Sequence, residues 1–403
     1  MEMPNTERAG KRLTFFVYAY WHDRNYRGFL GAVIKIWELA ENLTEMGHNV
    51  FLFIPQYPLP KSHPPFKVVR IPLLNAGFIR PLCFDCLSFL VSIYYGLLKG
   101  ANAVYMRRFT SILPLLFSRI LRIPFIYEVN DDPYLGRDCY SPRKWSVVKA
   151  IERMNLRRCD KISVVTQRIK EKLHHDFDIP LGKMVVIPSC SNTSIFKPMN
   201  RAKCTKRIGL DPNRRYVGFI GTFIRIQGPH LLIEATPYIL KACPDVRILM
   251  VGDGVMRGEL EDLTLRKNLK DYVIFTGHVP YLEAPAYINA MDVGTAPFLK
   301  DFGETVAVKV YDTLACGRPI VSSDFVKTRS DTSQTGAVLF VEPENPKALA
   351  EGIIKLLSDE GLRSTMGERG RQSVMKYFDR SQVARRIVQM ALETGHKRHK
   401  TVF

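Results

Sequence analysis

The strongest constraint on this chain is an alternation of apolar segments of strand length with one-sided helical segments. Residues 13–18 are a continuous apolar run, and residues 49–54 are another. Between them, after a glycine-containing loop at 25–31, residues 33–43 space their apolar side chains at i, i+3, i+4 and i+7, as an amphipathic helix does. Strands that are apolar throughout indicate a parallel sheet covered on both faces, so this stretch predicts a strand–helix–strand unit.

The alternation continues in two series. In the first series we predict strands at 13–18, 49–54, 104–105, 125–129, 161–166 and 185–188, with helices at 33–43 and 112–121. In the second we predict strands at 216–221, 246–251, 272–276, 293–297, 319–322 and 337–341, a helix at 229–242 and helices over 346–393. The expected fold is α/β, with two doubly wound, Rossmann-like domains facing across a cleft and C-terminal helices. Ligands of such sheets bind beyond the carboxyl ends of the strands.

The length of 403 residues suits two domains of about 200 residues each. We expect a first domain at 12–198, a linker at 199–213 and a second domain at 214–376. The linker prediction rests on the polar segment 192–213, which has two prolines and no hydrophobic periodicity. The final helix, 377–395, is expected to cross back to the first domain.

Composition excludes several classes of protein. With 46% hydrophobic and 24% charged residues, the chain is neither disordered nor fibrous. Its eight cysteines include one CxxC pair, Cys83 and Cys86, without a second pair to complete a zinc site, so we expect no metal and buried thiols in a reducing cytoplasm. The N-terminus carries no secretory pattern. The longest uncharged apolar run, 86–98, is shorter than the roughly 20 residues that span a bilayer, which predicts a soluble or peripheral protein.

The net charge of +19 predicts an anionic partner, which charge alone leaves open between nucleic acid, phospholipid and a phosphorylated substrate. Basic residues gather in 56–127 and 143–172, beside a set of apolar residues: Phe78, Ile79, Leu82, Phe84, Phe89, Tyr94, Tyr95 and Trp145. This combination favours docking on an anionic membrane surface. The alternative is a sheet-covering helix with solvated charges. Without a recognition helix, zinc finger or stacking platform, we expect no nucleic-acid partner.

A glycine-containing turn at 251–258 follows a predicted strand and opens a helix. Gly252 and Gly254 suit a backbone that approaches a phosphate at a helix N-terminus. Arg257 occupies the position of a third glycine, so this is not the dinucleotide fingerprint. A tight strand-to-helix turn explains the same letters, and the motif alone favours that explanation.

A second motif lies at 302–322, where Glu304 and Asp312 are eight positions apart with Lys309 between them. A helix beginning near Thr305 places Glu304 at its cap, with free backbone N–H groups next to it for an anion. Asp312, two turns along, lies on the same face and suits sugar hydroxyls. The alternative is an ordinary capped helix with a solvated acid.

Several segments in fixed order carry a family resemblance that covers residues 13–392. They read GHNVFLFIP, VVTQRIKEKL, IPSCSNTSIFKP, RILMVGDGVMRGELEDL, YVIFTGHVP and KVYDTLACGRPIVSSD. The chain resembles retaining glycosyltransferases of the GT-B fold, in the large family-four group (glycosyl transferases group 1). The resemblance implies transfer of a sugar from a nucleotide-sugar, with retention and no cofactor. It also implies that the domain at 12–198 binds the acceptor and the domain at 214–376 binds the nucleotide-sugar.

The resemblance also assigns roles to single positions. The family's two glutamates match Glu304, which would contact the transferred sugar, and Asp312, which would hold the ribose. The backbone of Thr305, Val306 and Ala307 would then face the sugar and diphosphate. The remaining matched positions are Gly28 and Gly31 in the N-terminal glycine loop, Asp131 after the fourth strand, and His278 and Val279 near the base. We take Glu304, Asp131 and Arg225 as the catalytic candidates.

Two departures concern the diphosphate. The family's usual arginine and lysine align with Thr222 and Gln227, so both expected cations are missing. Arg225, between them, and Lys309, in the second motif, are the candidates to supply the charge.

The expected function is a metal-independent, retaining glycosyltransferase, because preorganised amides and cations can stabilise a leaving diphosphate without a metal. UDP-sugar is the favoured donor and GDP-sugar the second. The acceptor is expected to be a lipid-linked or cell-surface polysaccharide glycan, and the protein to be cytoplasmic and peripheral on the inner face of the membrane. The alternatives are a catalytically weak GT-B-like partner subunit and a nucleotide-sugar epimerase.

Overall fold

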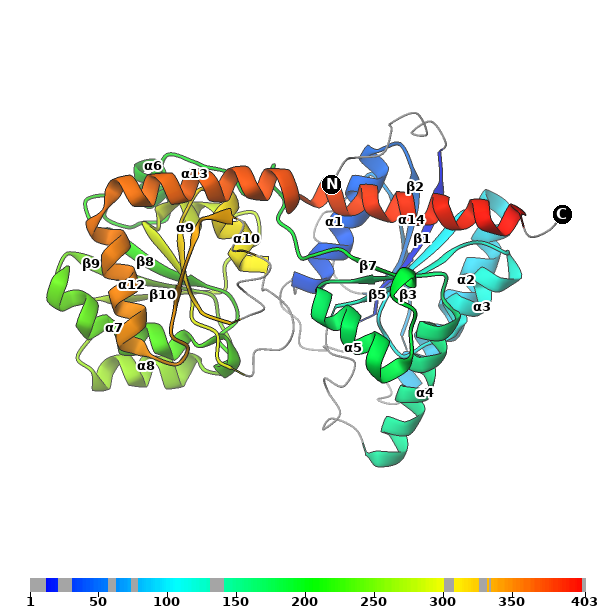
Figure 1. Cartoon of the computed structure of the whole chain (residues 1–403), viewed down its shortest axis with the longest axis horizontal. Coiled ribbons are helices and arrows are strands. Elements are labelled where there is room, and N and C mark those ends of the chain that lie inside the picture. The colour runs from blue at the N-terminus through cyan, green and yellow to red at the C-terminus, as the bar shows by residue number, and fades with distance from the viewer. Residues whose placement is uncertain are drawn as a thin grey trace. The chain divides into compact units, whose positions relative to one another are not determined.

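The computed structural model describes residues 12–20, 31–56, 63–73, 79–130, 141–300, 308–325, 332 and 335–400. The chain forms two compact units, each a parallel sheet flanked by helices (Figure 1). Unit 1 comprises Met1–Ile187 and Ser381–Phe403, and unit 2 comprises Pro188–Arg380. Both fold as the strand–helix alternation predicts.

Unit 1 holds a seven-stranded sheet in the order β3-β2-β1-β4-β5-β6-β7. Its strands are β1 (Thr14–Tyr18), β2 (Asn49–Pro55), β3 (Lys67–Ile71), β4 (Ala103–Arg107), β5 (Phe125–Val129), β6 (Lys161–Val164) and β7 (Met184–Val186). Its helices are α1 (Gly31–Glu45), α2 (Ile79–Lys99), α3 (Leu113–Ile120), α4 (Pro142–Arg158), α5 (Gln167–Phe177) and α14 (Arg380–Lys400), with a 3-10 turn at Leu181–Lys183. The strand order reverses between β1 and β4.

Unit 2 holds a six-stranded sheet in the order β10-β9-β8-β11-β12-β13. Its strands are β8 (Arg215–Ile220), β9 (Val246–Val251), β10 (Val273–Gly277), β11 (Val293–Ala296), β12 (Ile320–Ser323) and β13 (Val338–Val341). Its helices are α6 (Arg201–Arg207), α7 (Pro229–Ala242), α8 (Arg257–Arg266), α9 (Ala284–Ala290), α10 (Val308–Ala315), α12 (Pro346–Ser358) and α13 (Glu360–Tyr377), with the 3-10 turn η4 (Arg225–Gln227).

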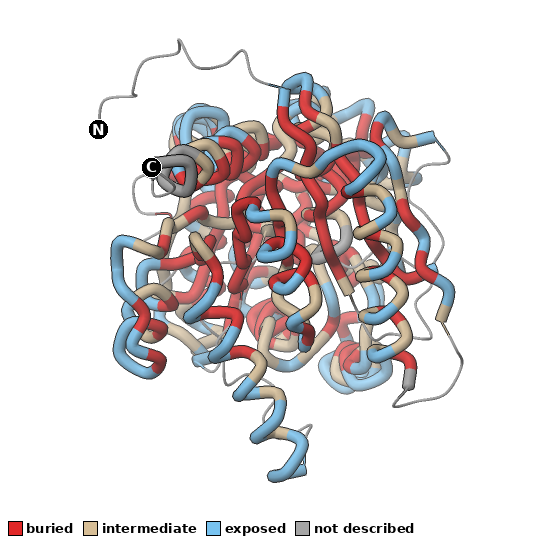
Figure 2. The backbone as a smooth tube through the Cα atoms, turned by 90° about the vertical axis from the view of Figure 1, so that its right-hand side faces the viewer, coloured by how far each residue is buried: buried red, intermediate tan, exposed pale blue. Residues whose placement is uncertain are grey.

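The central strands are buried on both faces because their side chains are apolar throughout. All five residues of β1 and of β5 are buried, as the continuous apolar runs predict. Aromatic contacts fill the core of unit 1, where the rings of Phe16 and Phe117 stack 5.3 Å apart. Figure 2 shows buried strands in the interior and a helix at the bottom, α4, that is exposed over most of its length.

The unit boundaries differ from the predicted ones. The chain passes between the units at 187/188 and again at 380/381, rather than in a linker at 199–213. That segment contains α6, which packs against α9 within unit 2 and buries Cys204 and Thr205. Asn200 caps α6 by accepting a hydrogen bond from the Lys203 N–H at 2.9 Å. The apolar positions of this helix are too few for a recognisable periodicity, which is why the sequence reads as a linker.

Helix α2 is longer than its uncharged run suggests, because Arg80 and Asp85 lie within it. By length and composition Arg80–Lys99 is sufficient to cross a membrane, with a mean hydropathy of 1.6 and 22% of its most apolar window buried. The prediction that this stretch is too short was therefore wrong. One side of α2 nevertheless covers the sheet of unit 1, burying Phe84, Ser88 and Ser92.

Candidate functional site

In unit 2 the strand order reverses at β8, which lies between β9 and β11. Loops leaving the carboxyl ends of β8 and β11 therefore diverge, and this is where open α/β sheets bind ligands. Gly221 follows β8 directly, with a φ of +141° that L side chains rarely adopt. The candidate donor site is built around this point by the segments that follow β8, β9 and β10 and by the first turn of α10.

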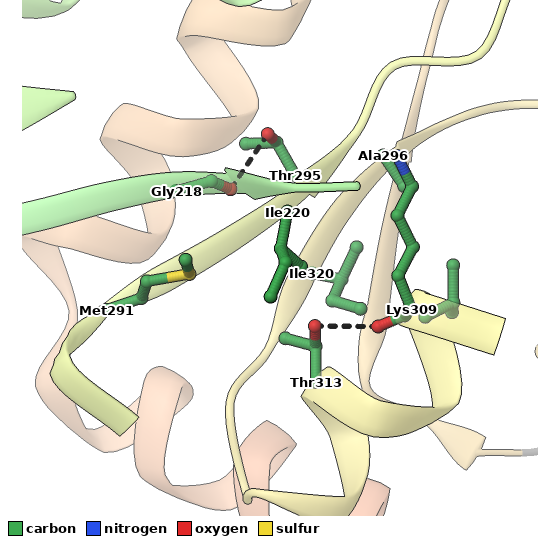
Figure 3. A pocket seen from close by; sticks show the side chains of 9 residues that line it. Gly218, Ile220, Met291, Thr295, Ala296, Lys309, Thr313 and Ile320 are labelled. Carbon is green, nitrogen blue, oxygen red and sulfur yellow. Dashed lines mark hydrogen bonds between the residues drawn. The ribbon is translucent and has the colours of Figure 1, made fainter. Parts of the chain in front are cut away.

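Lys309 lies on that first turn and reaches the reversal point. Its Nζ donates a hydrogen bond to Gln227 Oε1 at 3.0 Å and lies 3.7 Å from the centroid of the Phe219 ring. Figure 3 shows the side chain extended away from α10, and Lys309 and Ala296 at the end of β11 line the same pocket. The residues around its stem, among them Gly218, Met291 and Thr295, border a gap too narrow to admit a water molecule.

The electrostatic environment of Lys309 is unfavourable to its charge. The residue keeps partial solvent contact, but its ammonium end is enclosed by protein, and this burial lowers its pKa well below the usual value. The cation–π contact with Phe219 offsets only part of the desolvation. Its hydrogen-bond partner, Gln227, is neutral. Among the described residues, no carboxylate lies within ion-pair distance of this ammonium.

Asp312, one turn further along α10, is also buried. Its Oδ1 accepts a hydrogen bond from Ser191 Oγ at 2.6 Å. Burial raises the pKa of Asp312 to about 7, and the hydrogen bond from Ser191 opposes that rise. The alternative of a solvated acid is therefore excluded for Asp312, and the side chain can both donate and accept hydrogen bonds near neutral pH.

The glycines of the 251–258 turn are explained by packing. A Cβ on Gly252 would lie 2.0 Å from the carbonyl oxygen of Gly221, and one on Gly254 would lie 2.5 Å from that of Phe223. The turn after β9 thus presses against the loop after β8. This supports the tight-turn explanation for both residues, since their missing side chains make room for backbone rather than for a ligand.

Other predicted residues take peripheral positions. Arg225, on η4, is exposed, and its Nη1 lies 3.5 Å from Glu259 Oε1. Thr222 is exposed on the loop after β8, and His278 is exposed just beyond β10. Val279 packs against a small cluster of buried residues that includes Tyr216 and Met291.

Several predicted residues lie outside the described part of the chain: Glu304, Thr305, Val306, Ala307, Asp131 and Gly28. Gly31 is the first residue of α1. Within the described ranges no group of three or more His, Cys, Asp or Glu side chains is arranged to hold a metal ion.

A network of buried charges that the sequence did not reveal lies at the carboxyl edge of the sheet in unit 1. Lys35 Nζ of α1 lies 2.8 Å from Glu128 Oε1 of β5 and donates to Asn130 Oδ1 at 2.8 Å. Beside it, Arg108 Nε lies 3.2 Å from Glu152 Oε1, and Tyr127 Oη donates to Glu152 Oε2 at 2.8 Å. The sequence offers one sign of this network, which is the charged Glu128 within the otherwise uncharged strand β5.

Here each buried carboxylate has a cation within ion-pair distance. Burial alone would raise the pKa of Glu128, but the charges of Lys35 and Arg107 outweigh it and hold the pKa below its usual value. Burial and the nearby carboxylate of Glu152 raise the pKa of Tyr127 well above its usual value, so this phenol remains a hydrogen-bond donor.

Comparison with known proteins identifies the family. Residues 31–194 match Glycosyltransferase Family 4, and residues 214–359 match Glycosyl transferases group 1. The chain belongs to the group 1, family-four glycosyltransferases. It is 25% identical over 278 residues to alpha-D-kanosaminyltransferase of Streptomyces kanamyceticus, covering 67% of this chain and 68% of that protein.

This glycosyltransferase also shares the GT-B fold with solved structures. Sucrose-phosphate synthase from Thermosynechococcus elongatus superimposes with a TM-score of 0.75 at 20% identity, covering 95% of this chain and 99% of that one. HepE of Anabaena, solved in complex with UDP-glucose, gives 0.70 at 16% identity, covering 94% and 99%. At these identities the likeness concerns the fold alone, and it confirms the two-domain prediction.

Proposed function

We propose that this glycosyltransferase moves a sugar, with retention and without a metal, from a nucleotide-sugar to a lipid-linked or cell-surface polysaccharide acceptor. The observation that supports a nucleotide-sugar donor is the pair Lys309 and Asp312 at the carboxyl edge of the sheet in unit 2. A diphosphate needs a cation, and a ribose needs a group that donates and accepts hydrogen bonds. Both are supplied from adjacent turns of one helix, α10.

The proposed chemistry stabilises the leaving diphosphate with fixed cations and backbone amides. In this proposal Glu304 contacts the transferred sugar, Asp312 holds the ribose, and the amides of Thr305, Val306 and Ala307 face the diphosphate. Arg225 and Lys309 are the nearby cations. Asp131 is a catalytic candidate with Glu304 and Arg225, and the remaining donor-binding assignments are Gly28, Gly31, Thr222, Gln227, His278 and Val279.

UDP-sugars are the favoured donors and GDP-sugars the second. The UDP-glucose complex of HepE supports the first choice through a shared fold. A thermal-shift screen of the full chain against UDP, GDP, ADP and TDP tests it, because a ligand that binds only the folded state raises Tm by mass action. A selective rise with UDP is the expected result. Absence of any rise would favour a catalytically weak partner subunit, a candidate suggested by the uncharged Thr222 and Gln227.

Metal independence and the role of Glu304 have direct tests. Transfer is expected to persist in excess EDTA, and a requirement for added Mg²⁺ or Mn²⁺ would contradict the mechanism. Glu304→Gln is expected to slow transfer while UDP binding is retained. Full activity of that variant would remove Glu304 from the sugar site.

We further propose a cytoplasmic location, peripheral on the inner face of a membrane, where a lipid-linked acceptor would lie. The outward side of α2 supports this placement, since five large side chains on it are between 59% and 76% exposed: Leu82, Leu90, Tyr94, Leu97 and Leu98. Helix α3 packs beside α2 and adds the exposed Leu116 and Ile120. Exposed apolar side chains gathered on two neighbouring helices are typical of an interaction surface.

Basic residues adjoin the same face. Arg119 and Arg122 are exposed at the end of α3, and Arg119 also donates to the Arg158 carbonyl at the end of α4. Helix α4 itself carries six basic residues and one acid. Apolar side chains that enter the acyl region beside cations that meet anionic headgroups suit a helix lying in the membrane interface.

Vesicle sedimentation tests this location. The chain is expected to bind phosphatidylcholine/phosphatidylglycerol vesicles at low salt, to dissociate at high salt, and to ignore pure phosphatidylcholine. The double variant Leu90→Gln/Leu97→Gln is expected to bind more weakly. Leu265→Gln/Leu282→Gln, at exposed positions of unit 2, is the matched control. Equal vesicle binding of the two double variants would exclude α2 as the membrane-binding surface. If the α2 variant changed its oligomeric state and kept its vesicle binding, the exposed side of α2 would be a protein interface.

A further inference from the structure

Lys309 is a cation whose described neighbours do not balance its charge. Its ammonium has three N–H donors, and among the described residues one acceptor, Gln227 Oε1, receives one of them. Enclosing an ammonium without a counter-ion costs folding free energy because the charge loses its hydration. An enclosed, unpaired lysine is therefore expected where its charge binds a ligand. A methionine or leucine would fill the same space between Phe219 and Phe298 without that cost.

The ammonium occupies the functional edge of the sheet. It lies 3.7 Å from the centroid of the Phe219 ring at the end of β8 and 5.2 Å from that of the Phe298 ring just after β11, and the strand order reverses between these two strands. The two rings fix the position of Nζ. A Cβ on Gly221 would lie 3.3 Å from Nζ and 3.0 Å from Gln227 Oε1, so the glycine keeps the backbone side of this pair uncrowded.

The side chains of Gln227 and Lys309 end at the same place, which has room for one positive charge. Their polar ends touch, although the residues are 82 positions apart in sequence. A lysine at 227 would bring two ammoniums within contact distance, which like-charge repulsion opposes. One member of the pair can therefore carry the charge while the other is a neutral hydrogen-bonding partner, and in this chain the charged member is 309.

We propose that Lys309 is the residue that binds the diphosphate of the donor, with Gln227 positioning its ammonium, so that the cation missing at 227 is supplied from α10. This inference deepens the proposed function and rests on it. The diphosphate supplies the negative charge that the described surroundings of Lys309 lack, and the ammonium offers it the N–H groups that Gln227 leaves unused.

The first test is binding of UDP and of uridine to Lys309→Met by isothermal titration calorimetry. A charge-assisted hydrogen bond is worth about 1.5–3 kcal/mol, so we expect UDP affinity to fall by roughly 10- to 100-fold and uridine affinity to stay unchanged. Lys355→Met, at an exposed position of α12, removes the same formal charge and is expected to bind UDP as the wild type does. Undiminished UDP affinity in Lys309→Met would overturn the proposal.

The second test moves the charge across the pair. Gln227→Lys/Lys309→Met returns one ammonium to the same pocket from the other side, and we expect it to recover most of the UDP affinity that Lys309→Met loses. Loss without recovery would show that Lys309 acts through packing, which would also overturn the proposal. The melting temperature of each variant is measured alongside, and that of Lys309→Met is expected to equal or exceed the wild type's, so weak binding would not reflect unfolding.

Failure of the inference and failure of the proposed function give different results. If the wild type binds inorganic pyrophosphate in a Lys309-dependent manner but no nucleotide, the diphosphate assignment stands and the nucleotide-sugar reaction fails. If UDP binds equally well with and without Lys309, the reaction stands and this assignment fails. If neither UDP nor pyrophosphate binds, both are contradicted.

Discussion

The two sheets carry buried charges at their carboxyl edges in opposite ways. In unit 1, Lys35 pairs with Glu128 and Arg108 with Glu152. In unit 2, Lys309 and Asp312 are held by the neutral Gln227 and Ser191. Paired charges compensate one another's desolvation, whereas charges with neutral partners leave the fold with a cost that a ligand can relieve. The difference separates an edge whose charges are paired within the fold from one whose cation has no anionic partner among the described residues.

The largest effect is expected from Lys35→Met, which breaks an ion pair at the carboxyl edge of the sheet in unit 1. Removal of one partner leaves Glu128 buried with its main counter-ion gone, and breaking a buried pair costs about 3–5 kcal/mol. Arg107 remains as a second positive charge, so we expect a loss at the lower end, about 3 kcal/mol in the free energy of unfolding. Urea denaturation measures it, with the exposed Lys144→Met as control. Equal stability of the two variants would remove the contrast between the edges.

The matching change in unit 2 is expected to have the opposite sign. Lys309→Met should raise the free energy of unfolding by about 1–2 kcal/mol at pH 7, because it removes a charge from an enclosed site. The pKa of Lys309 is lower in the folded chain than its unfolded value of 10.5, so between the two values the unfolded state binds more protons. Wild-type stability therefore rises with pH in that window, relative to the variant.

The difference between wild type and Lys309→Met should consequently shrink as the pH increases from 7 towards 10. Urea denaturation of both proteins at several pH values measures it. A difference that stays constant over this range would mean that Lys309 does not change its protonation there, and would weaken the contrast with Lys35.

Asp312 and Glu128 should respond to acid in opposite directions. The folded-state pKa of Asp312 is about 7, above its unfolded value of 3.8, so the folded state binds more protons between these values and stability falls as pH rises through the window. Each pKa unit corresponds to about 1.4 kcal/mol, which makes a total of several kcal/mol the upper limit. Glu128 has a lowered pKa, so its contribution is present at neutral pH and is lost on acidification.

Asp312→Asn is therefore expected to flatten the fall in stability between pH 4 and pH 7, and Glu128→Gln to remove a loss of stability at lower pH. Denaturation curves of the wild type and both variants over pH 3–8 provide the measurement. Parallel pH profiles for the wild type and Asp312→Asn would show that Asp312 titrates normally in the folded chain.

The sequence predicted most strands because each is a short apolar run in a parallel sheet, but it missed the edge strand β3, whose apolar run is interrupted by Arg70. β5 and β9 lie where residues 125–129 and 246–251 were assigned. Helix boundaries and the boundary between the units were harder to predict from the sequence. α6 was read as a linker because its stability comes from packing against α9, and local periodicity does not report that.

The sequence proposes members of the candidate site but says nothing of their contacts. Glu304, Lys309 and Asp312 stand out by spacing, yet the partners that determine the chemistry of the last two, Gln227 and Ser191, lie 82 and 121 positions away. The turn at Gly252 shows the converse. Its letters fit both a phosphate loop and a tight turn, and the 2.0 Å approach to the Gly221 carbonyl favours the turn.

The smallest expected effect concerns Arg225, the other candidate cation, and it separates an exposed charge from an enclosed one beside the same loop. Its ion pair with Glu259 joins two side chains that are more than half exposed, and such pairs contribute between zero and about 1 kcal/mol. Arg225→Gln should therefore change the free energy of unfolding by well under 1 kcal/mol. It should weaken UDP binding less than Lys309→Met does, and the residual effect should disappear at high salt, because an exposed charge is screened and an enclosed one is not. Calorimetry at low and high NaCl measures this for both variants. A larger, salt-resistant loss in Arg225→Gln would make Arg225 the principal diphosphate cation and leave the cost of enclosing Lys309 unexplained.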